Sequence, residues 1–271
     1  MPRCRFYRGG SADVPLLRAT PDGAGGVAGM SSSSRALSGG GGAGGGGGAG
    51  GGGGAGGGGA AFVSPGSPPL RRVVIVPGNG AGCATSNFYA TLAAALRARG
   101  HEVLLHEMPD ADRARRRVWA PFIEAELVRG DEDVVVVGHS SGALAALRLA
   151  ERSRVRALVL VSATPSDLGD ANEAASGWYD DPWSWESVRA NARRVVLFAS
   201  DDDPFIPIAL QRAVRDGLAG AGDAGGAAGD AGSAGTFEYV ELSGRSHFFA
   251  RSQPEIEACV IRLAEENGGS Q

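Results

Sequence analysis

Short apolar runs alternate with amphipathic stretches along the chain from residue 71 onward. Most of these runs are apolar at every position, which is typical of strands that are buried on both faces of a parallel sheet. The expected strands are Val73–Val76, Glu102–Glu107, Val134–Val137, Val155–Ser162, Arg194–Ser200 and Phe237–Leu242. This alternation of strand and helix predicts a three-layer α/β domain with a mainly parallel, six-stranded sheet between two layers of helices.

Helical spacing of apolar residues predicts the covering helices. The expected helices are Ser86–Arg99, Ala111–Val128, Gly142–Arg152, Pro207–Leu218 and Pro254–Glu266. Pro121 falls within the second of them, where it should begin a new helical segment. The reason is that proline is tolerated in the first turn of a helix but not in its interior.

The first part of the chain has a composition that cannot build a core. Gly39–Gly59 is glycine with an occasional alanine, so it offers no side chains to bury and has much backbone entropy to lose. We therefore expect residues 1–69 to be a disordered low-complexity region and residues 70–271 to form one domain. A second tract of small residues, Ala219–Gly235, should be a flexible surface insertion in that domain.

Charge and composition exclude several classes of protein. The net charge is −4 and the pI about 5.6, which argues against a nucleic-acid partner that needs a basic face. The chain contains no apolar run of about 18 residues, so no membrane partner is expected. Cys4, Cys83 and Cys259 are odd in number and far apart, which fits neither a disulfide framework nor a zinc site.

The same cysteine usage indicates a reducing compartment, and we expect a cytoplasmic protein. An alternative remains open. Met1–Leu37 contains several arginines and serines but only two acidic residues, as organelle transit peptides do. A plastid or mitochondrial location is therefore the second possibility.

The segment GHSSG, Gly138–Gly142, joins an expected strand to an expected helix. It fits the pattern G-x-S-x-G with Ser140 at its centre, and the strand-turn-helix context is the one that a nucleophile elbow requires. The glycines would allow a sharp turn that projects the Ser140 hydroxyl above the sheet. The backbone N–H of Ser141, at the start of the helix, could then stabilise an oxyanion.

A nucleophilic serine needs a histidine base, and the chain has four histidines. His139 is the neighbour of Ser140 and should point elsewhere on the turn. His101 directly precedes the second expected strand and His106 lies near its end, both early in the chain. His247 follows the last expected strand, at the edge of an α/β sheet where active sites form, and is therefore the candidate base.

An acidic residue should complete the triad in the chain order serine, acid, histidine. Asp201, Asp202 and Asp203 follow the fifth expected strand, and spacing alone does not choose among them. The second oxyanion donor should be a backbone N–H of the glycine-rich turn after the first strand, from Asn79 or Gly80. This turn lacks the lysine of a phosphate-binding P-loop.

Several longer segments together resemble the serine hydrolase family of retinoblastoma-binding protein 9. They are VVIVPGNG, MPD, VVVGHSSGALAALRLAE, LVLVSATPSDLGDANEAASGW, PWSWESVRAN, DDPFIP and SHF. The resemblance implies a compact α/β-hydrolase fold and a triad of Ser140, Asp203 and His247, and it supplies no substrate. The physical argument for Asp203 is that Pro204 restricts its backbone and so holds the carboxylate in place.

The sequence departs from this family at the segment L-x-C-x-E, which is proposed to bind the retinoblastoma protein. Leu127–Glu132 reads LVRGDE here, with Arg129 in place of the cysteine. Binding to a retinoblastoma-type partner is therefore not expected.

Ser166–Glu186 is rich in aromatic residues and follows the fourth expected strand. These side chains could simply pack in the core. Alternatively they form a cap over Ser140 that shapes an apolar substrate pocket. The aromatic residues are Trp178, Tyr179, Trp183 and Trp185.

The leading hypothesis is a serine hydrolase that cleaves small-molecule esters or amides through an acyl-enzyme, with no metal and no cofactor. The alternative is a protein-interaction or regulatory module on a hydrolase scaffold, because a fold does not fix a function.

Overall fold

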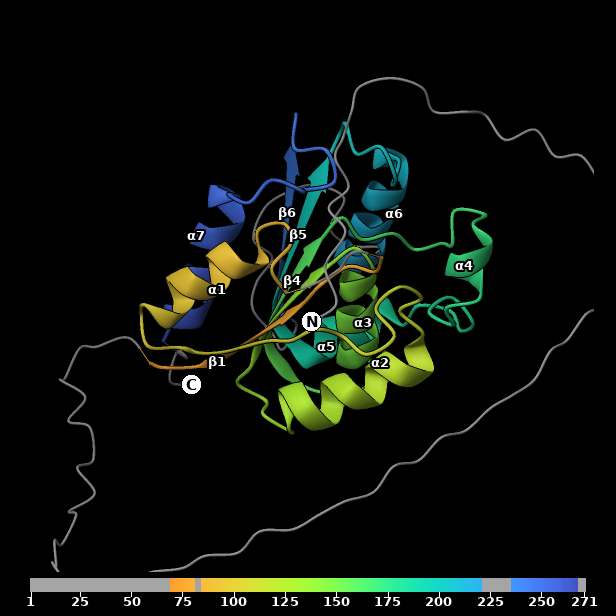
Figure 1. The fold of residues 1–271 in the computed structure, drawn as a ribbon. Coiled ribbons are helices and arrows are strands. Elements are labelled where there is room, and N and C mark those ends of the chain that lie inside the picture. Colours follow the sequence, from red (N-terminus) through yellow and green to blue (C-terminus); the bar gives the residue numbers. More distant parts are fainter. Residues whose placement is uncertain (1–68, 81–83, 221–234, 268–271) are drawn as a thin grey trace, which may run out of the picture. The chain divides into compact units, whose positions relative to one another are not determined.

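The computed structural model describes residues 69–80, 84–220 and 235–267. In these ranges six strands form one sheet with the order β2-β1-β3-β4-β5-β6, and all neighbouring strands are parallel (Figure 1). The strands are β1 (Arg72–Val76), β2 (Glu102–Leu105), β3 (Val135–His139), β4 (Val155–Val161), β5 (Ala192–Ser200) and β6 (Thr236–Leu242). The predicted six-stranded parallel sheet is confirmed.

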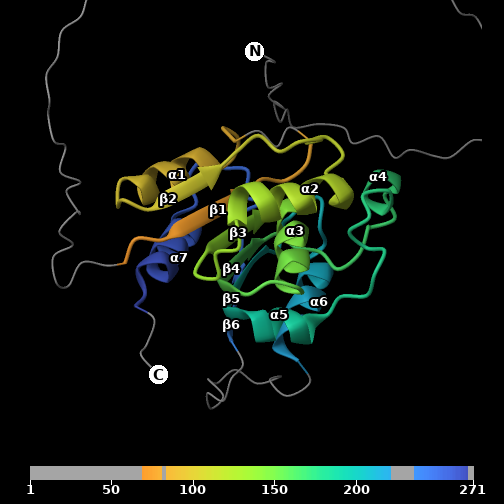
Figure 2. The same ribbon diagram turned by 90° about the horizontal axis from the view of Figure 1, so that it is seen from below.

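Helices cover both faces of this sheet, which gives the predicted three layers (Figures 1 and 2). The helices α1 (Tyr89–Arg97) and α7 (Pro254–Glu265) lie on one face. The other face is covered by α2 (Arg116–Phe122), the π-helix η1 (Ile123–Val128), α3 (Ser141–Ala150), α5 (Trp185–Asn191) and α6 (Ile208–Ala219). The short helix α4 (Ala171–Ala174) lies outside these layers.

Alternate residues of each strand enter the two cores. In β1, Val73 and Ile75 pack with residues of α1 and α7, whereas Val74 and Val76 pack with residues of α3. This alternation is the geometric consequence of the two-residue period of a strand. It explains why the central strands must be apolar at every position.

Pro121 does not begin a helical segment, so that prediction is wrong. It lies inside α2, where its missing N–H removes the bond to the carbonyl four residues earlier. The helix continues as the wider π-helix η1, at whose end the Arg129 N–H donates to the Glu124 carbonyl over 2.9 Å. The chain thus stays helical and keeps Ile123 and Leu127 buried in the core.

Two short helices between β4 and β5 were not predicted. The carboxylate of Asp170 caps α4 by accepting the N–H groups of Asn172 and Glu173. Helices of four and seven residues are too short to show a hydrophobic period, so sequence spacing does not detect them.

The two low-complexity predictions lie almost entirely outside the described residues: residues 1–69 apart from Pro69, and the segment Ala219–Gly235 apart from its ends. One residue contacts the chain on both sides of the second segment. The Arg189 side chain donates to the Gly217 carbonyl in α6 over 2.8 Å, and the Arg189 carbonyl accepts the Gly235 N–H over 3.2 Å. Both ends of this segment are therefore fixed at Arg189.

Candidate active site

The candidate residues follow the carboxyl ends of different strands of the sheet. Asn79 comes after β1, Ser140 after β3, Ser162 after β4, Asp203 after β5 and His247 after β6. Because all the strands are parallel, these ends lie along one edge of the sheet. The strand order also reverses between β1 and β3, and such a switch point is the usual location of a ligand site in an open α/β sheet.

Ser140 occupies a sharp turn with a backbone conformation that is unusual for serine, at φ 55° and ψ −121°. The flanking glycines make this turn possible. A Cβ atom on Gly138 would lie 2.3 Å from the Gly142 carbonyl oxygen, and one on Gly142 would lie 2.1 Å from the Val76 carbonyl oxygen. The turn therefore requires glycine at both positions and holds Ser140 at the amino end of α3, as an elbow should.

Asp203 and His247 meet in a hydrogen bond of 2.8 Å between the carboxylate Oδ2 and the imidazole Nδ1. The Asp203 side chain has no exposed surface. A carboxylate can only accept here, so His247 carries a proton on Nδ1, and in the neutral imidazole Nε2 is then an acceptor. That tautomer is the one that a general base needs.

Four hydrogen bonds hold the Asp203 carboxylate. Oδ2 also accepts the Ser162 hydroxyl over 2.9 Å, and Oδ1 accepts the N–H groups of Phe205 and Ile206 over 2.9 and 3.1 Å. Burial raises the pKa of Asp203, but the hydrogen bond and charge of His247 and the two N–H groups bring it below its usual value. The group is therefore ionised at neutral pH.

The other two aspartates of this turn have different roles. Asp202 is exposed, and its Oδ1 accepts the Ser200 hydroxyl over 2.6 Å and the Ser246 N–H over 2.9 Å. Asp201 is also exposed and accepts the Ser243 hydroxyl over 2.7 Å. The His247 Nδ1 donates to Asp203 and to neither of these carboxylates, and Asp202 holds the loop that leads to His247.

His139 and Tyr89 support the site in a way that sequence reasoning missed. The His139 Nε2 donates to the His247 carbonyl oxygen over 2.9 Å, and the two imidazole rings lie 4.8 Å apart. The Tyr89 hydroxyl contacts the His139 Nδ1 over 2.5 Å and accepts the Gly78 N–H over 3.1 Å. This series of hydrogen bonds links the turn after β1 to the His247 loop through His139, the residue before Ser140.

Complete burial, together with the smaller effect of the charge of His247, lowers the pKa of His139 to about 3. An unfolded histidine binds a proton below about pH 6.5. Between that pH and about 3 the unfolded chain therefore holds a proton that folded His139 does not. The resulting stability is fully present above pH 6.5 and is lost as the pH falls.

We predict that the lowered pKa of His139 makes the free energy of unfolding about 2 kcal/mol smaller at pH 5 than at pH 7. His139→Gln should remove this part of the pH dependence of the free energy of unfolding, even if the variant is less stable than the wild type at every pH. Urea unfolding at several pH values measures it. His106→Gln is the matched control, because His106 is exposed, and it should keep the wild-type slope. Equal slopes for wild type and His139→Gln would contradict the assignment.

The candidate oxyanion donors do not all remain available. Ser141 is the first residue of α3 and is buried, so its N–H lies among the donors without an intrahelical partner. The Gly80 N–H donates to the Ala111 carbonyl over 3.1 Å, so it would have to leave this partner to bind an oxyanion. Asn79 stays a candidate, and its side-chain amide donates to the Glu173 carboxylate over 2.8 Å, which ties the turn to α4.

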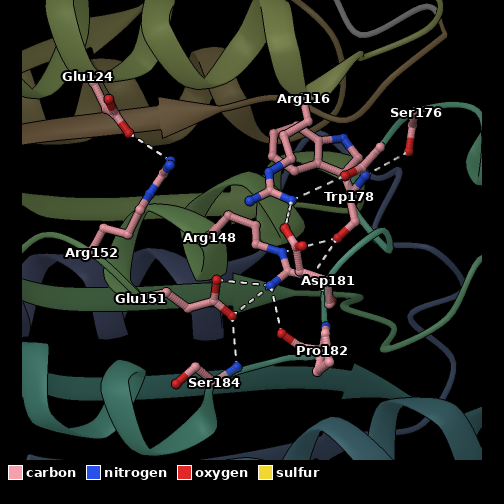
Figure 3. Close-up of polar contacts among 11 residues, drawn as sticks. Arg116, Glu124, Arg148, Glu151, Arg152, Ser176, Trp178, Asp181, Pro182 and Ser184 are labelled. Atoms are coloured by element: carbon pink, nitrogen blue, oxygen red, sulfur yellow. Dashed lines mark hydrogen bonds and ion pairs between the residues drawn. The ribbon is translucent and has the colours of Figure 1, made fainter.

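Trp178 does not face an open pocket. Its side chain is fully buried, packs against Trp119 and donates its indole N–H to the Ala114 carbonyl over 2.7 Å. Buried Arg148 of α3 binds the surrounding segment through the carbonyl groups of Trp178, Asp181 and Pro182 (Figure 3). Trp178 is therefore core packing, the other alternative that the sequence left open.

Trp183 and Trp185 lie beside this anchor. Their rings stack at 5.5 Å, and the Arg148 guanidinium lies 3.8 Å from the centre of the Trp183 ring. Both line an open depression of about 600 Å³ with Arg189, Asp216 and other residues of α5 and α6. None of Ser140, Asp203 and His247 lines this depression, so it does not support the predicted substrate pocket.

Tyr179 keeps the closest connection to the candidate site. Its buried hydroxyl has no hydrogen-bond partner among the described residues. Burial raises the pKa of Tyr179, and the carboxylates of Glu173 and Asp167 raise it further. Since Glu173 in turn binds Asn79, Tyr179 stays a candidate for a substrate contact.

Two phenylalanines that the sequence analysis did not select flank His247. The ring centres of Phe205 and Phe249 each lie 5.2 Å from that of His247, and both side chains are about half exposed. The signal available was the position of each one beside a candidate residue, two after Asp203 and two after His247.

Comparison with known proteins identifies the family of this chain. The alpha/beta hydrolase fold model matches residues 71–218. Serine hydrolase RBBP9 of Rattus norvegicus is 48% identical over 149 residues, which are 54% of this chain and 80% of that protein. The chain belongs to the RBBP9 family of serine hydrolases. The resemblance identified from its motifs is confirmed.

Solved structures support the fold of this α/β hydrolase. The ydeN gene product of B. subtilis has a TM-score of 0.60 at 17% identity and covers 73% of this chain and 100% of its own. Est1E of Butyrivibrio proteoclasticus has a TM-score of 0.51 at 15% identity and covers 74% and 88%. At these identities the likeness extends to the fold alone.

Other predictions for this hydrolase concern its partners. Within the described ranges no helix is long and apolar enough to span a membrane, and no cluster of three His, Cys, Asp or Glu residues could hold a metal ion. In the segment Leu127–Glu132, Leu127 is buried and Arg129 has a left-handed backbone at the end of η1. The absence of retinoblastoma binding stays a prediction, as does the absence of a cofactor.

Proposed function

We propose that this protein hydrolyses small-molecule esters or amides through an acyl-enzyme formed on Ser140. The observation that carries the proposal is the 2.8 Å bond between buried Asp203 and His247, on the same edge of the sheet as the strained Ser140 turn. The ring of His139, the residue before Ser140, contacts the His247 ring, so the two loops lie side by side.

In this proposal the Ser140 Oγ attacks the carbonyl carbon while the His247 Nε2 takes the hydroxyl proton. The bond from the carbonyl carbon to the leaving oxygen or nitrogen breaks, and His247 returns the proton to that atom. Water then repeats the sequence on the acyl-enzyme and releases the acid. Asp203 stays ionised and stabilises the imidazolium in both steps.

Two backbone N–H groups would stabilise the negative charge on the carbonyl oxygen. One is that of Ser141, whose position at the start of α3 adds the helix dipole. The second is that of Asn79 in the turn after β1. This turn lies against the elbow, since a Cβ on Gly78 would be 3.1 Å from the Ser140 Cβ. Such preorganised donors are typical of acyl-transfer sites.

A fluorophosphonate probe tests the proposal on the full-length protein. The wild type should be labelled covalently, and Ser140→Ala should not be labelled although it stays folded. Ser153→Ala, which lies beyond the opposite end of α3, is the matched control and should be labelled like the wild type. Mass spectrometry should place the adduct on the peptide that contains Ser140.

The alternative function is a protein-interaction or regulatory module on this scaffold. The ordered Asp203–His247 pair favours the enzyme, because a binding surface does not need a histidine held in one tautomer. Well-folded wild type that the probe does not label would favour the module. The expected compartment is the cytoplasm, with a plastid or mitochondrion as the alternative.

A further inference from the structure

Exposed aromatic side chains gather at one place in the described part of the chain. Among the described residues four large apolar side chains are exposed, those of Leu70, Leu168, Phe205 and Phe249, and only the last two are aromatic. Phe205 and Phe249 are in contact, with ring centres 5.8 Å apart and planes at 79°. Exposing two large rings side by side is unfavourable in water, and contiguous exposed apolar surface marks binding sites.

The two rings surround the candidate base. The His247 imidazole meets the Phe205 ring at 65° and the Phe249 ring at 63°, both at 5.2 Å, so the three rings contact one another edge to face. His247 itself is only 5% exposed. The two phenylalanines therefore present exposed apolar surface directly beside the imidazole.

Both phenylalanines are positioned by the groups that hold the site. The Phe205 N–H donates to Asp203 Oδ1 over 2.9 Å. Phe249 follows Phe248, whose fully buried side chain anchors the loop after His247. The rings are thus held by short connections to Asp203 and His247 and do not belong to a long mobile loop. A preorganised surface loses little entropy on binding.

The chemistry determines which part of a substrate lies there. During acylation His247 protonates the departing atom, so that atom must come within hydrogen-bond reach of the imidazole. Whatever is attached to it then lies against the side chains that flank the imidazole. We propose that Phe205 and Phe249 bind an apolar, preferably aromatic, leaving group, which makes esters of aromatic alcohols the preferred substrate class. This inference rests on the proposed function.

The test uses two esters with the same acyl group and leaving alcohols of similar acidity, benzyl acetate and 2-methoxyethyl acetate. The wild type should have the higher kcat/KM for benzyl acetate. Phe205→Ala and Phe249→Ala should each lower kcat/KM for benzyl acetate by about tenfold and reduce the preference accordingly. Leu70→Ala is the matched control, since it removes an exposed apolar side chain before β1, at the opposite edge of the sheet.

Fluorophosphonate labelling separates the possible results, because its leaving group is fluoride and needs no apolar surface. Variants that are labelled at the wild-type rate but lose the benzyl preference support the inference. Variants that are labelled and keep the preference overturn it and leave the hydrolase proposal intact. Variants that lose labelling also overturn it, because the rings would then act on His247 itself. An unlabelled wild type overturns the proposed function and this inference with it.

Discussion

Asp203→Asn should lower turnover by about 10³–10⁴-fold, the scale seen when a triad acid loses its charge. The side-chain carbonyl oxygen would stay with the two backbone N–H groups at Oδ1, so the amide nitrogen would take the place of Oδ2. It would then present N–H groups to the His247 Nδ1 and the Ser162 hydroxyl, both of which now donate to Oδ2. The histidine would then adopt the other tautomer and lose Nε2 as an acceptor. Single-turnover kinetics with an activated ester measures the effect.

Asp202→Asn is a closely matched control. Its Oδ1 accepts from Ser200 and Ser246, and an asparagine carbonyl oxygen can accept the same two bonds. We expect a loss of less than about tenfold for this variant and for Asp201→Asn, as for one exposed charge. A crippling effect of Asp202→Asn with a mild effect of Asp203→Asn would show that the triad acid is the neighbouring residue.

Gly142→Ala should destabilise the fold by about 3 kcal/mol or more and abolish labelling of Ser140. The added Cβ would lie 2.1 Å from the Val76 carbonyl oxygen and 2.6 Å from that of Pro77. Both are backbone atoms, so no side-chain rotation can relieve the clash. Either α3 moves away from β1 or the elbow opens, and both changes displace Ser140.

Urea unfolding together with probe labelling measures this prediction. Gly130→Ala is the matched control, because Gly130 has φ 71° but no atom within 4 Å of an added Cβ. It should cost only the strain of a left-handed alanine, about 1 kcal/mol, and keep full labelling. If Gly142→Ala were as stable and as reactive as Gly130→Ala, the close approach of α3 to β1 would not be essential.

The parts of the fold that follow from local pattern could be predicted from the sequence. Strands such as Val135–His139 are apolar on both faces because both faces are buried, so composition alone marks them. The three triad candidates, Ser140, Asp203 and His247, come after β3, β5 and β6, so their order along the chain follows the order of these strands. What spacing left open was the choice among Asp201, Asp202 and Asp203, and of these Asp203 is the one hydrogen-bonded to the histidine.

Contacts between distant segments could not be predicted. Trp178 is an apolar side chain in a loop, and only the packing of Trp119 and Arg148 around it shows that it is core. The partner of the Gly80 N–H is a carbonyl 31 residues away, at Ala111. Phe205 and Phe249 drew no attention because local pattern does not reveal that two separate loops meet beside one imidazole.

The double attachment at Arg189 has a practical consequence for engineering. Since one residue holds the chain where it leaves α6 and where it enters β6, the length of chain between Gly220 and Gly235 does not determine the spacing of these elements. Lengthening a closed loop costs little, about 0.6 kcal/mol for each doubling. The segment between Gly220 and Gly235 leads into the amino end of β6, whereas His247 follows the carboxyl end of that strand. We therefore expect that a fluorescent reporter protein whose own termini lie close together can be inserted between Gly220 and Gly235 without loss of labelling by the fluorophosphonate probe.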